Sequence, residues 1–283
     1  MHYISRLESS LYTTRSPCQR IGVLCQRGCS HVANQQFSHM PTIPSFASIT
    51  ILNCGLDCAS NPCEITLQAS QSFPACPRSW NSSERQPVAD NWAAKDKSNC
   101  QGSLVLQLCE RISEGRSGSV YAALVKVAID GNGDDVSACL PAILCLKFAK
   151  RQFCRSLARE AWFYERLSGC QGTAIPRCFG FFKSSFHEQQ RHLASIVPWE
   201  GIVHKYVPPT ATRKDRPSLD RVEDDNPNAR QYHDERGFKR DSPWNFWNYS
   251  EEDPTITVLL LEKLGEPVAD HWLAWATPPD GLK

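Results

Sequence analysis

The amino-acid sequence predicts an α+β fold in which about five antiparallel strands carry one packed helix. Short apolar runs rich in strand-forming residues, separated by Gly, Asn, Asp and Pro, begin near residue 104. One later stretch changes to helical periodicity, and polar stretches without periodicity lie before and within this pattern. We therefore expect a small ordered sheet and helix flanked by disordered segments.

Residues 1–100 are expected to form a disordered extension. They mix Ser, Pro, Cys, Gln and Asn and offer little apolar surface to offset the entropy of ordering. One run, FASITIL at residues 46–52, has the composition of a strand and would pair if a partner were supplied.

Three sequential antiparallel strands are predicted next along the chain. LVLQLCERI begins at Leu104, and SVYAALVKVAI follows a cluster of Gly and Ser. AILCLKFA comes after the turn signal DGNGDD at residues 130–135.

A single helix is predicted after the third strand. From Ser156 onward, apolar side chains recur at helical spacing while arginines lie off their stripe. The stripe consists of Leu157, Ala161, Tyr164 and Leu167. Gly169 and Gly172 end the helix, and CFGFF at residues 178–182 has the composition of another short strand.

Residues 183–254 are expected to be a long insertion. They carry dense mixed charge and Pro and are not expected to supply a core of their own. Strand character returns at residues 256–261. The chain is therefore divided into an extension at residues 1–100 and a domain at residues 101–283 that contains the insertion.

The charge balance argues against nucleic acid or an anionic membrane as a partner, because 31 Lys and Arg face 30 Asp and Glu. No apolar run approaches the ~18 residues that a membrane-spanning helix needs, and no secretory signal is evident. We therefore expect an intracellular protein, cytoplasmic or nuclear, whose 14 cysteines are reduced.

Three candidate functional features follow one another along the chain. ISEGRSGSVY at residues 112–121 is a glycine-bearing turn between strands, which either cradles phosphate or is a hairpin that needs positive φ. Lys147 lies in an apolar strand, either buried with an anionic partner or pointing to solvent from an edge strand. Glu160 belongs to the apolar face of the predicted helix, unless it is a boundary residue paired with a neighbouring arginine.

Together with the strand LLLEKLG, these features resemble the protein kinase-like superfamily, with ISEGRSGSVY in place of its G-x-G-x-x-G-x-V loop. The resemblance implies the five-stranded antiparallel sheet of that family's N-terminal lobe, Ser/Thr type by default. It also implies ATP as the ligand and Lys147 and Glu160 as the catalytic pair that anchors the phosphates. The ATP-binding residues that it implies are Ile112, Gly115, Gly118, Val120, Cys145, Lys147, Leu261, Glu262 and Leu264. Leu261 would be the gatekeeper, and the backbone of residues 262–264 would be the hinge that binds adenine.

Two departures from the family pattern are evident. Ser113 replaces the first glycine of the loop, and no H-R-D-type catalytic loop or D-F-G follows Leu264. HDER at residues 233–236 precedes the hinge strand and lies in the charged insertion. The resemblance therefore implies a truncated, pseudokinase-like domain that binds ATP, does not hold Mg²⁺ by itself and has no phosphotransferase activity on its own.

Two alternatives remain open at this point. The chain could be a non-catalytic scaffold that binds a protein partner through the charged insertion. It could also be a small cysteine-rich metal protein, although the spacing of its zinc candidates does not match the common zinc sites. These candidates are Cys18, Cys25, Cys29 and His31. Asp130, Asn132 and Asp134 imitate the start of a calcium loop but are expected to form a turn.

Overall fold

The computed structural model describes residues 45–75, 92–189, 193–200, 222 and 241–265. Strands dominate these residues, and one α-helix, α3, spans Cys154–Arg166. The strands are β1 (Ser48–Leu56), β2 (Pro62–Ala69), β3 (Ser103–Glu114), β4 (Gly118–Ile129), β5 (Ile143–Ala149), β6 (Cys178–Ser185), β7 (Ser195–Ile196) and β8 (Thr255–Glu262). The shorter elements are α4 (Phe186–Gln189) and the 3-10 turns η2 (Ser137–Cys139), η3 (Ser168–Cys170) and η4 (Val197–Trp199).

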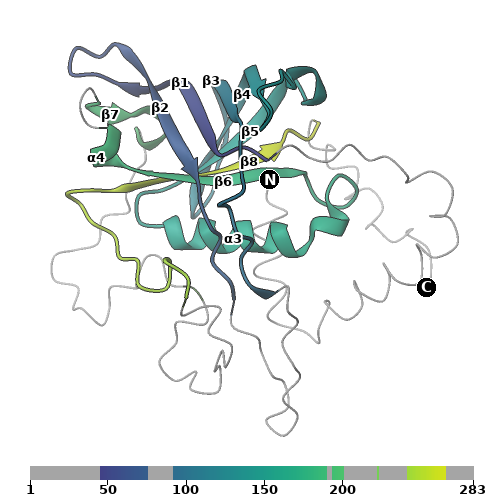
Figure 1. The fold of residues 1–283 in the computed structure, drawn as a ribbon. Helices are drawn as coiled ribbons and strands as arrows, with labels where there is room; N and C mark the ends of the chain where they lie inside the picture. The colour runs from purple at the N-terminus through teal and green to yellow at the C-terminus, as the bar shows by residue number, and fades with distance from the viewer. Residues whose placement is uncertain (1–44, 76–91, 190–192, 201–221, 223–240, 266–283) are drawn as a thin grey trace, which may run out of the picture. The chain divides into compact units, whose positions relative to one another are not determined.

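Seven of the strands close into a mixed β-barrel, with α3 on its outside (Figure 1). The order around the barrel is β2-β6-β8-β5-β4-β3-β1, and pairing between β1 and β2 closes the ring. All neighbours are antiparallel except β1 and β3, which run parallel. The short strand β7 pairs with the end of β1.

The predicted fold of five antiparallel strands is therefore wrong. Strands form at all five predicted places, as β3, β4, β5, β6 and β8, but they are part of a larger closed barrel. The sheet does not end at β3 or β6, because β1 pairs with β3 and β2 pairs with β6. Closure removes the open edges that five strands alone would expose.

The disorder predicted for residues 1–100 is also wrong for the part that the structure describes. Strand β1 overlaps the FASITIL run, and its partners are β2, β3 and β7. Ile49 and Ile51 alternate inward along β1, and Ile65 and Leu67 do so along β2; all four are fully buried. Residues 1–44 and 76–91 lie outside the described residues.

The barrel interior is filled by apolar side chains from one face of every strand. Along β5, for example, Leu144, Leu146 and Phe148 alternate into the core. Because each strand contributes its inward face only, residues on the opposite face of β5 must find partners outside the barrel. That outward face is the one toward α3.

The segment around β7 supplies part of this core, although the sequence predicts that the insertion at residues 183–254 has no core of its own. Leu193, Ile196 and Trp199 belong to the barrel core. A Cβ on Gly55 would lie 2.2 Å from Leu193 Cδ1, so β1 and this segment are in close contact. Most of the remaining insertion, residues 201–221 and 223–240, lies outside the described residues.

Helix α3 forms where the sequence predicts a helix and packs against β8 and β6. Leu157, Ala161 and Tyr164 of the predicted apolar stripe are buried, whereas Leu167 follows the last helical residue and is 41% exposed. No helix within the described ranges is long and apolar enough to cross a membrane.

Candidate functional site

Lys147 lies on a central strand of the barrel, with β4 on one side of β5 and β8 on the other. The interpretation of Lys147 as an edge-strand lysine is therefore wrong. Its neighbours Leu146 and Phe148 point into the barrel core, so alternation along β5 directs Lys147 to the outside. There its Nζ lies 2.6 Å from Oε2 of Glu160, and the two side chains expose only 16% and 10% of their surface.

Glu160 projects from α3 toward the barrel, and its ion-pair partner is Lys147 rather than a neighbouring arginine. The predicted pairing of strand lysine and helix glutamate is thus present in the structure. One carboxylate oxygen, Oε1, is buried without a hydrogen-bond partner among the described residues. The hydroxyl of Tyr164, one turn further along the helix, is also buried without a hydrogen-bond partner among the described residues.

Tyr164 was predicted only as a member of the apolar stripe, and its polar end makes it part of this site. Desolvation by burial raises the pKa of Tyr164, and the nearby carboxylate of Glu160 adds to the rise. The phenol therefore stays protonated and remains a hydrogen-bond donor beside Glu160. Helical spacing alone could have placed Tyr164 near Glu160, because residues four apart share one face.

The glycine-bearing turn joins β3 to β4 and is fastened to the end of β5. The Gly115 amide donates to the Gly118 carbonyl at 2.8 Å, and the Lys150 amide donates to the Ser117 carbonyl at 2.9 Å. Lys150 Nζ also lies 2.6 Å from Oε1 of Glu114, which forms a second ion pair with Arg111. The hydrogen bond from Lys150 lowers the pKa of Glu114, so the carboxylate stays charged at neutral pH.

The two glycines of this turn have different roles, and neither has positive φ. The interpretation of the turn as a hairpin that needs positive φ is therefore wrong. A Cβ on Gly118 would lie 2.3 Å from the backbone oxygen of Phe148, so only glycine lets β4 approach β5 here. A Cβ on Gly115 would have no neighbour closer than 3.8 Å.

We expect Gly118→Ala to lower the free energy of unfolding by about 2 kcal/mol, because the added methyl group overlaps backbone that cannot move aside cheaply. Gly115→Ala is the matched control, since its methyl group meets open space and should change stability by less than about 0.5 kcal/mol. Urea denaturation of both variants measures the difference. Equal stability of the two would contradict this role for Gly118.

The predicted adenine-contacting residues share one outward face with Lys147. Val120 is directly opposite Lys147 across the β4–β5 pair, and Cys145 is opposite Leu261 across the β5–β8 pair. All three are buried, with exposures of 6%, 3% and 5%. A bound base would therefore have to replace contacts that these side chains already make. Burial also raises the pKa of Cys145, so its thiol is not a ready nucleophile.

The predicted hinge is engaged at its first residue. The Glu262 amide donates to the Arg177 carbonyl at 2.8 Å, and the Glu262 carboxylate pairs with the Arg177 guanidinium at 3.0 Å. That amide is therefore already used within the fold. Ile112 and Leu264, the other two predicted contacts, are 39% and 59% exposed.

No group of three or more His, Cys, Asp or Glu side chains that could hold a metal ion occurs within the described ranges. Asp130 instead closes a turn: its Oδ1 accepts from the Asn132 amide at 2.8 Å and from the Asp134 amide at 2.9 Å. The zinc candidates Cys18, Cys25, Cys29 and His31 lie outside the described residues.

Among the described residues, the fold thus brings together one set of predicted site residues. Lys147 and Glu160 form an ion pair, and Val120, Cys145 and Leu261 lie beside them. The glycine turn lies at the end of the same strands. Comparison with known proteins found no family model, no curated protein and no solved structure that matches the chain.

Proposed function

We propose that this chain is a protein kinase-like protein that binds ATP, with Lys147 as the phosphate anchor. The observation that supports the proposal most directly is the ion pair between Lys147 and Glu160 on the outward face of the barrel. A lysine in the middle of an apolar strand is costly to bury, and pairing with a helix carboxylate holds its ammonium in one place. This arrangement suits a residue whose task is to meet an anion at a defined position.

The ammonium group has donors left for such an anion. It carries three N–H bonds, and Glu160 is its only hydrogen-bond or ion-pair partner among the described residues. Phosphate oxygens could accept the remaining donors without breaking the pair with Glu160. The glycine turn is bound to β5 through Lys150 and Ser117, so its backbone is held near the end of the same strand.

The proposal is one of binding, without phosphoryl transfer by these 283 residues alone. Transfer requires a group that orients the accepting hydroxyl and carboxylates that hold Mg²⁺, and the sequence has no H-R-D or D-F-G motif after residue 264. In the proposed site, Lys147 binds and orients phosphate, Glu160 positions Lys147, and Val120, Cys145 and Leu261 provide an apolar wall.

Titration with a fluorescent ATP analogue tests the proposal. We expect saturable binding that Lys147→Met weakens by roughly 10- to 100-fold, since a hydrogen bond to a charged group contributes about 1.5–3 kcal/mol. Lys126→Met is the matched control, because Lys126 is an exposed lysine on β4 and should leave affinity unchanged. ADP and ATP should compete much better than adenosine, because the anchor contacts phosphate.

Two results would overturn the proposal. One is the absence of saturable binding by the folded wild-type chain. The other is equal affinity in wild type and Lys147→Met, which would place any nucleotide somewhere else on the molecule.

A further inference from the structure

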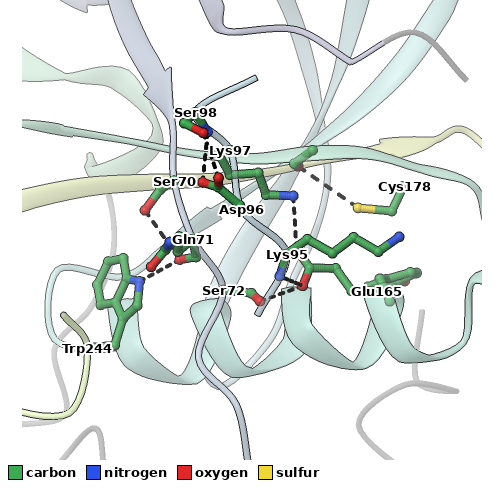
Figure 2. Close-up of polar contacts among 12 residues, drawn as sticks. Ser70, Gln71, Ser72, Lys95, Asp96, Lys97, Ser98, Glu165, Cys178 and Trp244 are labelled. Atoms are coloured by element: carbon green, nitrogen blue, oxygen red, sulfur yellow. Dashed lines mark hydrogen bonds and ion pairs between the residues drawn. The ribbon is translucent and has the colours of Figure 1, made fainter. Parts of the chain in front are cut away.

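Two short segments from the first hundred residues lie against α3 on the side opposite Glu160, and the first of them also bonds to barrel strand β6, where the Ser70 amide donates to the Phe181 carbonyl at 2.8 Å. We call residues 70–75 and 92–98 together the strap. The close-up in Figure 2 shows Ser72, Lys95 and Lys97 of the strap gathered around Glu165 of α3. The sequence predicts disorder for both segments, so this contact is a feature of the tertiary structure.

Glu165 is the polar centre of the contact. Its Oε2 accepts from the Ser72 hydroxyl at 2.8 Å and from the Lys95 amide at 3.1 Å. Its Oε1 lies 2.9 Å from Lys97 Nζ, and the carboxylate is only 13% exposed. Both parts of the strap therefore converge on one carboxylate, which can hold two donors and an ammonium at once.

Backbone and aromatic contacts extend this attachment along the helix. The Phe73 amide donates to the Ala158 carbonyl at 3.0 Å, and Arg159 Nε donates to the Phe73 carbonyl at 2.8 Å. Trp162 Nε1 donates to the Trp92 carbonyl at 2.8 Å, and the two indoles meet edge to face at 5.0 Å. The strap is therefore bonded to about two turns of α3, from Ala158 to Glu165.

A third segment ties the strap to the rest of the fold. Trp244 is 1% exposed, its indole donates to the Gln71 carbonyl at 2.7 Å, and Arg155 Nε donates to the Trp244 carbonyl at 2.9 Å. The strap is thus anchored at a point outside α3 as well as on it.

The strap and Lys147 act on opposite sides of the helix. An α-helix turns by about 100° per residue, so Trp162 and Glu165 point about 200° and 140° away from Glu160. Helix α3 is therefore held by Lys147 of the barrel at Glu160 and by the strap on the opposite side of the helix. A rotation of the helix about its axis that moved Glu160 away from Lys147 would have to break the bonds to the strap.

We propose that the strap positions α3 for ligand binding, and that Glu165 is the positioning residue through which it holds Glu160 against Lys147. The contacts between the strap and α3 support the positioning role, whereas the effect on ATP binding rests on the function proposed above. Loss of the strap bonds removes contacts on the side of α3 opposite Glu160, so Lys147 spends more time unpaired. An unpaired Lys147 reacts faster with amine-directed reagents. Its ammonium group is also held less firmly in the position where it would bind a phosphate.

The rate at which an amine-reactive ester modifies Lys147, followed by site-resolved mass spectrometry, tests the positioning without any nucleotide. Glu165→Gln in the full chain keeps the volume and removes the charge, and we expect several-fold faster modification of Lys147. Exposed Lys126 serves as the internal reference within each sample. Glu110→Gln is the matched control, since Glu110 is an exposed residue of β3, and should leave the rate at Lys147 unchanged.

Unchanged modification of Lys147 in Glu165→Gln would overturn the proposal. If circular dichroism shows that this variant does not fold, Lys97→Gln removes the other half of the ion pair and carries the same expectation. Glu165→Gln should also bind the fluorescent ATP analogue several-fold more weakly. If the wild-type chain binds no nucleotide, the proposed function is wrong, while the modification rates still decide whether the strap positions α3.

Discussion

Lys147→Met and Glu160→Gln are each expected to lower the free energy of unfolding by about 3 kcal/mol, and the double variant by clearly less than the sum. Each single change leaves the other group partly buried without its partner at 2.6 Å, whereas the double change removes both charges. The coupling arises because a buried charge left without its partner lowers the free energy of unfolding, not because the intact pair is strongly stabilising. Urea denaturation of the four proteins gives the coupling energy directly.

The control for this cycle uses Lys126→Met and Glu110→Gln, an exposed lysine and an exposed glutamate on β4 and β3. Their effects should be small and additive, because exposed charges lose little when a partner is removed. Strict additivity in the Lys147 and Glu160 cycle would contradict the structural pairing. It would also remove the observation on which the proposed function depends most.

Ile65→Ala is expected to lower the free energy of unfolding by about 3 kcal/mol, within the range of about 2–5 kcal/mol for truncation of a large buried aliphatic residue. Ile65 lies in β2, is fully buried, and faces Ile51 of β1 across the strand pair that closes the barrel. A truncated side chain there leaves a cavity in the barrel core. Were residues 1–100 disordered, as their composition predicts, the same change would have no effect on stability.

Ile143→Ala is the matched control for Ile65→Ala, because Ile143 begins β5 and is 43% exposed. Its removal should cost no more than about 1 kcal/mol, since much of the side chain is already in water. Amide hydrogen exchange offers a second measurement, in which β1 and β2 should be as protected as β5. Rapid exchange throughout β1 and β2 would contradict the closed barrel.

The ion pair at the centre of the candidate site could be predicted from the sequence because its signals are local and periodic. Alternation of period two along residues 143–149 separates Lys147 from the core-facing Leu146 and Phe148. Helical spacing puts Glu160 on the stripe of Leu157 and Tyr164. Strand β5 and helix α3 then carry opposite charges on the sides that face each other. Pairing these two charges avoids burying either one alone, and the structure shows that pair.

Other features of the site could not be predicted because they depend on close contacts between strands. The need for glycine at position 118 comes from the Phe148 carbonyl, which lies where a Cβ would be, and not from any backbone angle of the turn itself. The ion pair between Glu262 and Arg177 joins the end of β8 to the residue just before β6, and these two residues are far apart in the sequence. No local pattern reports such distances.

By itself the sequence determined where the five strands and the helix begin and end to within a few residues, and which side chains of β5 and α3 face each other. Only the tertiary structure decided that the sheet closes. Ser48 pairs with Ser103, and Gln68 pairs with Lys183, so the barrel depends on contacts between distant parts of the chain. A short apolar run such as β1 is marginal alone, because one strand cannot offset its ordering entropy. It becomes stable when β3 and β2 supply hydrogen bonds and the barrel core buries its isoleucines. The strap gains its order in the same way from α3.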